Sequence, residues 1–304
     1  MATFSDYVKN IFWVLLLLQF APLFFKGIRT QYSDMFEEKT RVGVIPITGD
    51  IEHANPTIKD VKKFFEDKNL KAIVLKIDSP GGVSPAGQAI FQEILHYKKL
   101  HPEKFVVSYV ERLAASAAYY IACAGDYIIA TPSSTIGSIG VIIQHPSFKG
   151  LLEKINVSYT ITKTGEYKGI GNPFLTMTPE EKAIFQELSN DTYKQFIRDV
   201  SAQRPQLSTD VKLWAEGKIF TGEQALALKL IDETGSPSTV ERVLREKAQI
   251  IGKVEWIKPA KKRSFLANLF AQDEDDDSIT YLSAAVDSIC QAVESRYATQ
   301  SMLS

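Results

Sequence analysis

Short apolar runs alternate with helix-length amphipathic segments between about residues 40 and 257. Uninterrupted apolar runs bounded by turn residues predict buried strands, and apolar positions three and four apart predict helices. The expected strands are 41–47, 72–77, 105–110, 127–130, 139–143 and 157–162. The expected helices are 58–65, 86–100, 114–124, 179–203, 208–215, 221–228 and 240–246. Because helices separate most of the strands, the strands should pair in parallel through crossovers, as in an α/β fold.

The N-terminal region departs from this alternation. Residues 11–25 read IFWVLLLLQFAPLFF and carry no charge. A membrane-spanning helix needs about 20 apolar residues, so the segment predicts an anchor over residues 1–30. A cleaved signal peptide would show a small-x-small site after Phe25, and the sequence has none. A buried core helix would show a polar face, which this run lacks. Lys26 and Arg29 outnumber Lys9, which by charge alone favours a cytoplasmic domain.

The C-terminal region also differs from the centre. Residues 258–263 are basic and residues 273–277 are all acidic, a pattern typical of solvated, flexible chain. Apolar residues then recur at helical spacing over 279–293, which predicts an amphipathic helix for docking or self-association. No strong linker divides the centre. We therefore expect an anchor at 1–30, one domain at 31–257 and a charged tail at 258–304.

Composition narrows the possible functions. Apolar residues make up 45% and charged residues 23% of the chain, which is typical of a globular protein. The formal net charge of −1 gives no general attraction to nucleic acid, so we expect no nucleic-acid partner. Cys123 and Cys290 cannot form a disulfide framework. Cys123 lies in an apolar stretch and is predicted to be a buried free thiol.

Glycine- and serine-bearing turns follow several of the predicted strands, where α/β folds bind ligands. Gly81 and Gly82 follow the strand at 72–77, but the spacing of phosphate-binding loops is absent. Ser116 lies where a helix should begin after the strand at 105–110. It could cap that helix, or it could be a nucleophile whose oxyanion is stabilised by the helix N-terminus.

Two kinds of base could activate Ser116. His145 lies near a predicted strand end and could form a triad with Asp126 or Asp78. Lys168, in the glycine-bearing loop 165–171, could serve as a neutral amine if its pocket lowers its pKa. A single lysine is more often a solvated surface charge, so the residues alone leave both options open.

Five segments in order resemble the signal peptide peptidase A family of membrane-anchored serine peptidases, including its SohB branch. They are 78–82 (DSPGG), 115–120 (ASAAYY), 135–141 (TIGSIGV), 165–168 (GEYK) and 220–225 (FTGEQA). The resemblance implies an α/β ClpP/crotonase-like fold of repeated ββα units, with an N-terminal transmembrane helix and no metal or other cofactor. It also implies Ser116 as the nucleophile and Lys168 as the general base. Ser138 would hold the lysine amine, and the Gly82 and Ala117 amides would form the oxyanion hole.

The resemblance further implies a homo-oligomeric ring that cleaves signal-peptide remnants and other apolar peptides. It would be a single-pass protein of the inner (plasma) membrane with an extracytoplasmic catalytic domain, against the charge count. One departure is that Ala117 and Ala118 stand where the family usually has two glycines. Because of that difference, an inactive membrane-bound scaffold is an alternative hypothesis for this protein. A crotonase-like acyl-CoA enzyme and a Ser–His–Asp peptidase using His145 are two further hypotheses for the same residues.

Overall fold

The computed structural model describes residues 38–260 together with Trp13. The anchor predicted at 1–30, apart from that tryptophan, and the helix predicted at 279–293 lie outside the described residues. Among the described residues, no helix has the length and apolar character needed to cross a membrane. The chain divides into two compact units, Met1–Lys258 and Pro259–Ser304. The strands and the numbered helices all belong to the first unit.

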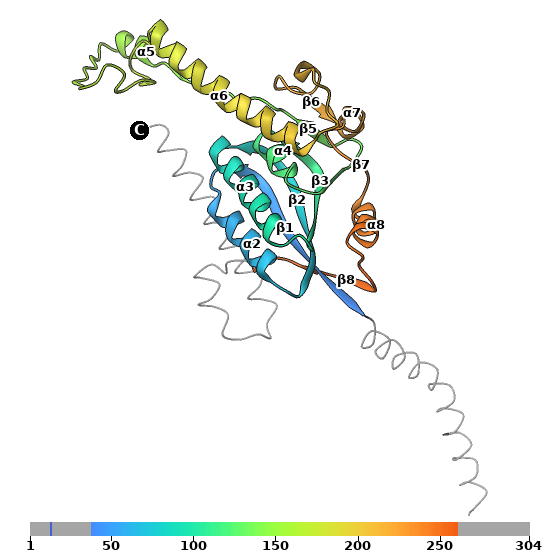
Figure 1. The fold of residues 1–304 in the computed structure, drawn as a ribbon. Helices are drawn as coiled ribbons and strands as arrows, with labels where there is room; N and C mark the ends of the chain where they lie inside the picture. Colours follow the sequence, from blue (N-terminus) through green and yellow to red (C-terminus); the bar gives the residue numbers. More distant parts are fainter. Residues whose placement is uncertain (1–12, 14–37, 261–304) are drawn as a thin grey trace, which may run out of the picture. The chain divides into compact units, whose positions relative to one another are not determined.

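Strands and helices alternate along the first unit (Figure 1). The strands are β1 (Lys39–Ile51), β2 (Leu70–Gly82), β3 (Phe105–Ala115), β4 (Tyr127–Ala130), β5 (Thr135–Gly137), β6 (Ile219–Thr221), β7 (Glu233–Thr234) and β8 (Lys253–Ile257). The helices are α2 (Asn55–Glu66), α3 (Ser84–Leu100), α4 (Ala117–Ala122), α5 (Lys149–Lys154), α6 (Pro179–Gln203), α7 (Gly222–Ala227) and α8 (Pro237–Lys247), with a 3₁₀ turn η1 (Val211–Leu213).

The strands form one mixed sheet in the order β6-β5-β3-β2-β1-β8, with β4 pairing β3 and β7. Every pairing is parallel except that of β5 with β6. This confirms the expected α/β fold with parallel pairing. Helices alternate one to one with strands from β1 to α4, so the order differs from the repeated ββα units that were expected.

Alternate residues of each central strand enter two different hydrophobic cores, because successive strand side chains point to opposite faces. Ile45 and Ile73 belong to the core shared with α2, α3 and α4. Val44 and Val74 belong to the core that α8 closes on the other face through residues such as Val243. The sheet is therefore covered by helices on both faces. Its strand ends remain as the place where turns from different strands can meet.

Several predicted boundaries are wrong. Residues 78–82, expected as a turn, belong to β2, and the helix expected from residue 114 begins at Ala117. The runs 139–143 and 157–162 form no strand, and 208–215 contains only the turn η1. Apolar composition predicted these strands, but Ile142 is 81% and Val157 49% exposed, and neither run pairs with a sheet edge. Strands β1 and β3 continue past the predicted ends at residues 47 and 110, to Ile51 and Ala115. The remaining strands and helices are confirmed within a few residues.

Helix α6 leaves the sheet and carries an extended arm (Figure 1). It begins after Thr178, which forms a reciprocal capping box with Glu181. Only Phe196 and Val200, near its C-terminal end, are buried. Its N-terminal half projects away from the sheet toward α5. We define the arm as residues 142–188.

Candidate active site

Three glycine- or serine-bearing segments meet at one edge of the sheet. Gly82 ends β2, Ser116 follows β3 and Ser138 follows β5. Strand β3 pairs in parallel with both β2 and β5. Because parallel neighbours end at the same edge, the sheet itself brings these three positions together.

Close backbone contacts hold Ser116 at this edge. Its amide donates a hydrogen bond of 2.8 Å to the carbonyl oxygen of Gly137, the residue before Ser138. On the other side lies Gly81, with a φ of 106°. A Cβ added to Gly81 would lie 2.8 Å from the Ser116 Cβ. Only glycine fits there, because it tolerates both the positive φ and the close approach.

The backbone of Ser116 adopts a strained conformation, with φ 51° and ψ −125°. Ser116 occupies the N-cap position of α4, but its hydroxyl makes no capping hydrogen bond, so capping does not account for the side chain. Non-glycine residues in such regions cost about 1–3 kcal/mol and persist where the surrounding structure imposes them. These dihedral angles make a sharp turn between the last residue of β3 and the first residue of α4. A serine nucleophile on such a strand-to-helix turn has an exposed hydroxyl.

Ala117 is the first residue of α4, and the first amides of an α-helix have no acceptor inside the helix. Its N–H therefore remains available beside the Ser116 hydroxyl. Gly82 borders the same space from β2, with its Cα packed against the Ile51 backbone. The two amides expected for an oxyanion hole thus flank one cavity.

The methyl groups of Ala117 and Ala118 are buried, with side chains 3% and 0% exposed. The Ala117 methyl packs against Gly87 of α3, where an added Cβ would lie 2.7 Å from it. Glycine at position 87 makes room for the alanine that replaces the family's usual glycine. Both methyl groups are therefore packed in the core, and neither is exposed in the cleft.

Ser116, Ser138, Gly82 and Ala117 all line one cavity of about 720 Å³. The cavity is bounded by the β2–α3 turn, by the segment after β5, and by one face of α6. Its lining consists of Pro80, Gly82, Val83, Ser84, Ser116, Ala117, Tyr120, Ser138, Gly140, Val141, Ile142, Gln186, Ser189, Asn190, Tyr193, Phe196, Glu216 and Gly217. Four of the five residues predicted for the site are therefore assembled within one chain.

Lys168, the fifth, does not line this cavity. It lies on the arm, in a series of turns where its amide bonds to the Gly165 carbonyl at 3.1 Å, and it is exposed to solvent. The chain alone does not bring its amine to Ser116.

The members of the predicted Ser–His–Asp triad are separated as well. The ring of His145 packs on Phe185 of the arm at 4.0 Å between centroids, and His145 does not line the Ser116 cavity. Asp78 is paired with Arg112 at 3.1 Å. Asp126 precedes β4 and so lies at the opposite edge of the sheet from Ser116.

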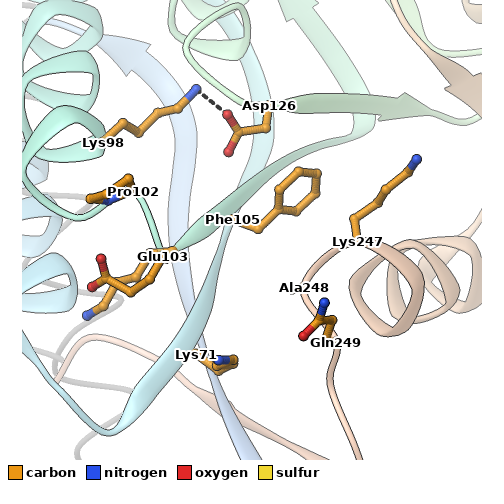
Figure 2. Close-up of a pocket in the computed structure, with 10 residues that line it drawn as sticks. Lys71, Lys98, Pro102, Glu103, Phe105, Asp126, Lys247, Ala248 and Gln249 are labelled. Atoms are coloured by element: carbon orange, nitrogen blue, oxygen red, sulfur yellow. Dashed lines mark ion pairs between the residues drawn. The ribbon is translucent and has the colours of Figure 1, made fainter.

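Asp126 borders a second cavity of about 490 Å³, shown in Figure 2. There it pairs with Lys98 at 2.7 Å and accepts a bond from the Val106 amide. The cavity is lined by Lys71, Lys98, Pro102, Glu103, Lys104, Phe105, Asp126, Lys247, Ala248 and Gln249. Asp126 thus supports the strand ends at that edge and has no geometric relation to Ser116.

Sequence reasoning missed the clamp that seats α6 on α4. Tyr120 stacks on Phe196 of α6 with ring centroids 4.4 Å apart, and its hydroxyl donates to Asp199. Burial and this hydrogen bond raise the pKa of Tyr120, so the phenol stays protonated. The spacing of Phe196 and Asp199, one turn apart on α6, was the available signal, but an isolated helix does not reveal its partner.

Cys123, also near α4, is a buried free thiol, as predicted. Burial raises its pKa to about 12, which keeps it protonated and unreactive. Ser116 is therefore the better nucleophile in this region.

Two family models match the sequence: Peptidase family S49 over residues 98–251, and Clp protease over residues 29–160. The chain is 38% identical over 206 residues to the "Putative protease slr0021" of Synechocystis sp., covering 66% of this chain and 73% of that protein. It is 34% identical over 214 residues to the "Putative signal peptide peptidase SppA" of Enterococcus faecium, covering 67% and 61%. It is 34% identical over 215 residues to the "Probable protease SohB" of Haemophilus influenzae, covering 69% and 59%.

The chain spans between 58% and 73% of the length of its first four curated relatives. The S49 match includes Ser116, Ser138 and the arm that carries Lys168, whereas Gly82 and the β2–α3 turn lie in the part matched by the Clp protease model. With half of the sequence matched by the family model and a fold of the Clp protease type, the chain belongs to peptidase family S49, among relatives of the SppA and SohB type.

Proposed function

We propose that this protein is a membrane-anchored serine endopeptidase with Ser116 as its nucleophile. The observation that carries the proposal is the strained serine at the end of β3, which borders one cavity with Gly82, Ala117 and Ser138. The Ser116 hydroxyl makes no capping hydrogen bond, so capping of α4 does not explain a serine at this point. An acyl-transfer site does require an exposed hydroxyl next to free amides.

In this proposal the Lys168 amine acts in its neutral form as general base. It removes the proton from Ser116 Oγ as that oxygen attacks the peptide carbonyl carbon. The Gly82 and Ala117 amides stabilise the oxyanion, and Ser138 holds the amine by a hydrogen bond. The protonated lysine then gives its proton to the leaving amine, and water hydrolyses the acyl-enzyme with the lysine again as base.

The proposal requires Lys168 to reach Ser116 of a neighbouring subunit. Two observations support this arrangement. Lys168 lies on the arm, which extends away from the sheet (Figure 1), and it does not line the cavity of its own chain. That arm also contains eleven of the eighteen exposed large hydrophobic side chains of the described residues. Exposed apolar surface on this scale is typical of an interface. A head-to-tail assembly of identical subunits would cover the arms and complete every site, and such an assembly can close into a ring.

The test is complementation between two inactive variants. We expect Ser116→Ala and Lys168→Ala each to abolish cleavage of an apolar fluorogenic peptide. When the two are mixed and allowed to exchange subunits, some interfaces join an intact Ser116 to an intact Lys168. In a random one-to-one mixture, roughly a quarter of the interfaces would do so.

Recovery of about that fraction of wild-type activity would support a site shared between subunits. Full activity in Lys168→Ala would exclude the dyad. Two inactive variants that never complement, despite demonstrated subunit exchange, would place the lysine in its own subunit or exclude it. A fluorophosphonate probe that labels wild-type protein but not Ser116→Ala identifies the nucleophile independently of Lys168.

We further propose that residues 1–30 anchor the protein as a single span in the plasma membrane, with the catalytic domain outside the cytoplasm. Membrane-embedded peptides such as signal-peptide remnants would then reach the site along the bilayer. Expression of the full chain and of residues 31–304, followed by membrane fractionation and protease accessibility, tests the anchor and its orientation. Full chain in the soluble fraction would contradict the anchor.

Three competing functions make different predictions. A Ser–His–Asp peptidase requires His145→Ala to be inactive, whereas the proposal expects that variant to cleave normally. An inactive scaffold predicts no labelling of Ser116 in a protein that still assembles. An acyl-CoA enzyme predicts no covalent serine intermediate. The scaffold was kept open because Ala117 and Ala118 replace two glycines, and the burial of both methyl groups weakens that reason.

A further inference from the structure

The cavity beside Ser116 has one polar wall. Gln186, Ser189, Asn190 and Tyr193 line it from α6. Their spacing of three and four residues places them on a single face of the helix. Apolar side chains line the cavity as well, with Val83 50% exposed and Ile142 81% exposed. The cavity therefore combines polar and apolar lining, whereas the sequence resemblance implied apolar peptide substrates.

Glu216 is the only charged residue among those that line the cavity in the described part of the chain. Its Oε1 accepts a hydrogen bond of 2.8 Å from the Tyr193 hydroxyl. Its backbone amide in turn donates to that hydroxyl at 3.1 Å. Two bonds to one tyrosine thus fix the glutamate against the polar face of α6.

The backbone around Glu216 also holds it near the nucleophile. Glu216 has a left-handed φ of 63°, an uncommon conformation for glutamate. The next residue, Gly217, donates to the Ile139 carbonyl at 2.9 Å, and the Lys218 carbonyl accepts from the Ser138 amide at 2.7 Å. Residue 216 is therefore tied to the segment that carries Ser138.

The nearest lysine in sequence, Lys218, does not pair with the Glu216 carboxylate. Lys218 directs its amine to the Lys212 carbonyl at 2.7 Å. Within residues 38–260, the Glu216 carboxylate has Tyr193 as its hydrogen-bond partner and forms no ion pair. One of its oxygens thus remains free to accept a bond from a molecule in the cavity.

From this arrangement we infer a substrate subsite for a basic side chain, formed by Glu216 and the polar face of α6. The inference rests on the proposed peptidase function and specifies its substrates. The preferred peptide places a lysine or arginine against Glu216 and apolar residues against Val83 and Ile142. A cationic side chain supplies the donor that the free carboxylate oxygen lacks. Because Glu216 is exposed in this chain, the attraction is that of a solvent-screened ion pair.

The experiment compares cleavage of matched peptides by the full-length enzyme. The peptides share an apolar core and differ by lysine, norleucine or glutamate at each position around the cleaved bond. At one position we expect lysine to be favoured over norleucine by about fivefold in kcat/KM, the upper range for a partly exposed ion pair. The effect should lie mainly in KM, because the contact exists before the reaction begins.

Glu216→Gln keeps the size of the side chain and an oxygen for Tyr193, and should abolish the lysine preference, measured as the ratio of kcat/KM for the lysine and norleucine peptides. Glu187→Gln is the matched control, since Glu187 is exposed on α6 next to Gln186 but does not line the cavity. It should keep the preference. High salt should reduce the preference in wild-type enzyme and in this control, but not in Glu216→Gln.

Each other outcome has a defined meaning. Peptides cleaved without a lysine preference, or with a preference that Glu216→Gln retains, overturn the subsite but leave the peptidase intact. A Glu216→Gln enzyme that has lost its assembly by light scattering shows that the glutamate pairs with a second subunit, which also overturns the subsite. Absence of both cleavage and Ser116 labelling in wild-type protein rejects the peptidase function, and the subsite with it.

Discussion

The amide of Ser116 donates a hydrogen bond of 2.8 Å to the carbonyl oxygen of Gly137. This bond links the end of β3 to the end of β5, so that Ser116 and the residue after Gly137, Ser138, enter the same cavity. Both serines have a φ of 51°. The pairing of two short strand ends thus holds two strained serines side by side, and several predictions depend on that strain and its surroundings.

Ser116→Gly should be inactive but more stable than Ser116→Ala. Glycine adopts φ 51° and ψ −125° with less strain, whereas alanine keeps the strain of serine. After the larger chain entropy of unfolded glycine is subtracted, we expect a difference of about 1 kcal/mol in the free energy of unfolding. Urea denaturation of both variants measures it. Equal midpoints would mean that the backbone at Ser116 stores no strain.

Gly87→Ala should impair both stability and catalysis. The added Cβ would lie 2.7 Å from the Ala117 Cβ, so α3 and the start of α4 must separate. We expect a loss of about 1–3 kcal/mol in unfolding free energy. We also expect a lower kcat, because the Ala117 amide shifts from the oxyanion. The double variant Gly87→Ala/Ala117→Gly removes one of the two methyl groups and should recover part of both. Failure to recover either would show that the two positions are not coupled.

Asp199 should contribute an acid-sensitive part of the stability. Burial alone would raise the pKa of its carboxyl, but hydrogen bonds from Arg198 and Tyr120 outweigh burial and hold that pKa below its usual 3.8. The unfolded chain then binds the proton first as the pH falls. The contribution is therefore complete above about pH 3.8 and is lost as the pH falls through the lower folded value.

Thermal unfolding between pH 6 and pH 2.5 checks this expectation. The melting temperature of Asp199→Asn should be lower near neutral pH and fall less steeply in acid than that of wild type. Asp191→Asn is the control, because Asp191 is exposed on the same helix and accepts a bond from Gln195 at 2.8 Å. If the melting temperatures of Asp199→Asn and wild type fall in parallel with pH, Asp199 makes no acid-sensitive contribution to stability.

Asp126→Ala should destabilise the protein without changing the chemical step. The substitution leaves the Val106 amide, which now bonds to the Asp126 carboxylate at 2.8 Å, without that acceptor, and Lys98 without its ion pair. A loss of about 1–3 kcal/mol in unfolding free energy is typical of such changes. At a temperature where the variant is fully folded, its kcat should equal that of wild type. A large loss of kcat in the folded variant would show that Asp126 takes part in catalysis.

Much of the fold followed from local patterns. The long β2 and β3 cores are apolar runs of β-favouring residues, and α6 begins at a Thr178 capping box that was readable in sequence. The residues at which these strands end could not be predicted from local patterns. Residues 78–82 contain proline and two glycines yet continue β2, because pairing with β1 continues through Gly82. Local propensity does not contain that long-range pairing.

The site divides in the same way. The sequence determined which residue types are present at the strand ends: Gly82, Ser116, Ala117, Ser138 and, on a separate loop, Lys168. It also determined the period of α6, and hence that one face of that helix is polar. These are properties of short segments, in which each residue's neighbours along the chain set its geometry.

Only the tertiary structure decided which segments meet. The adjacency of β2, β3 and β5 brings four of the predicted residues to one cavity. Lys168 lies on the arm and does not line that cavity. It also brings Glu216 to Tyr193, a contact between positions 23 residues apart that no local pattern marks. The physical reason is that strand order and helix docking depend on burial summed over the whole sheet, so the partners of a side chain depend on distant residues.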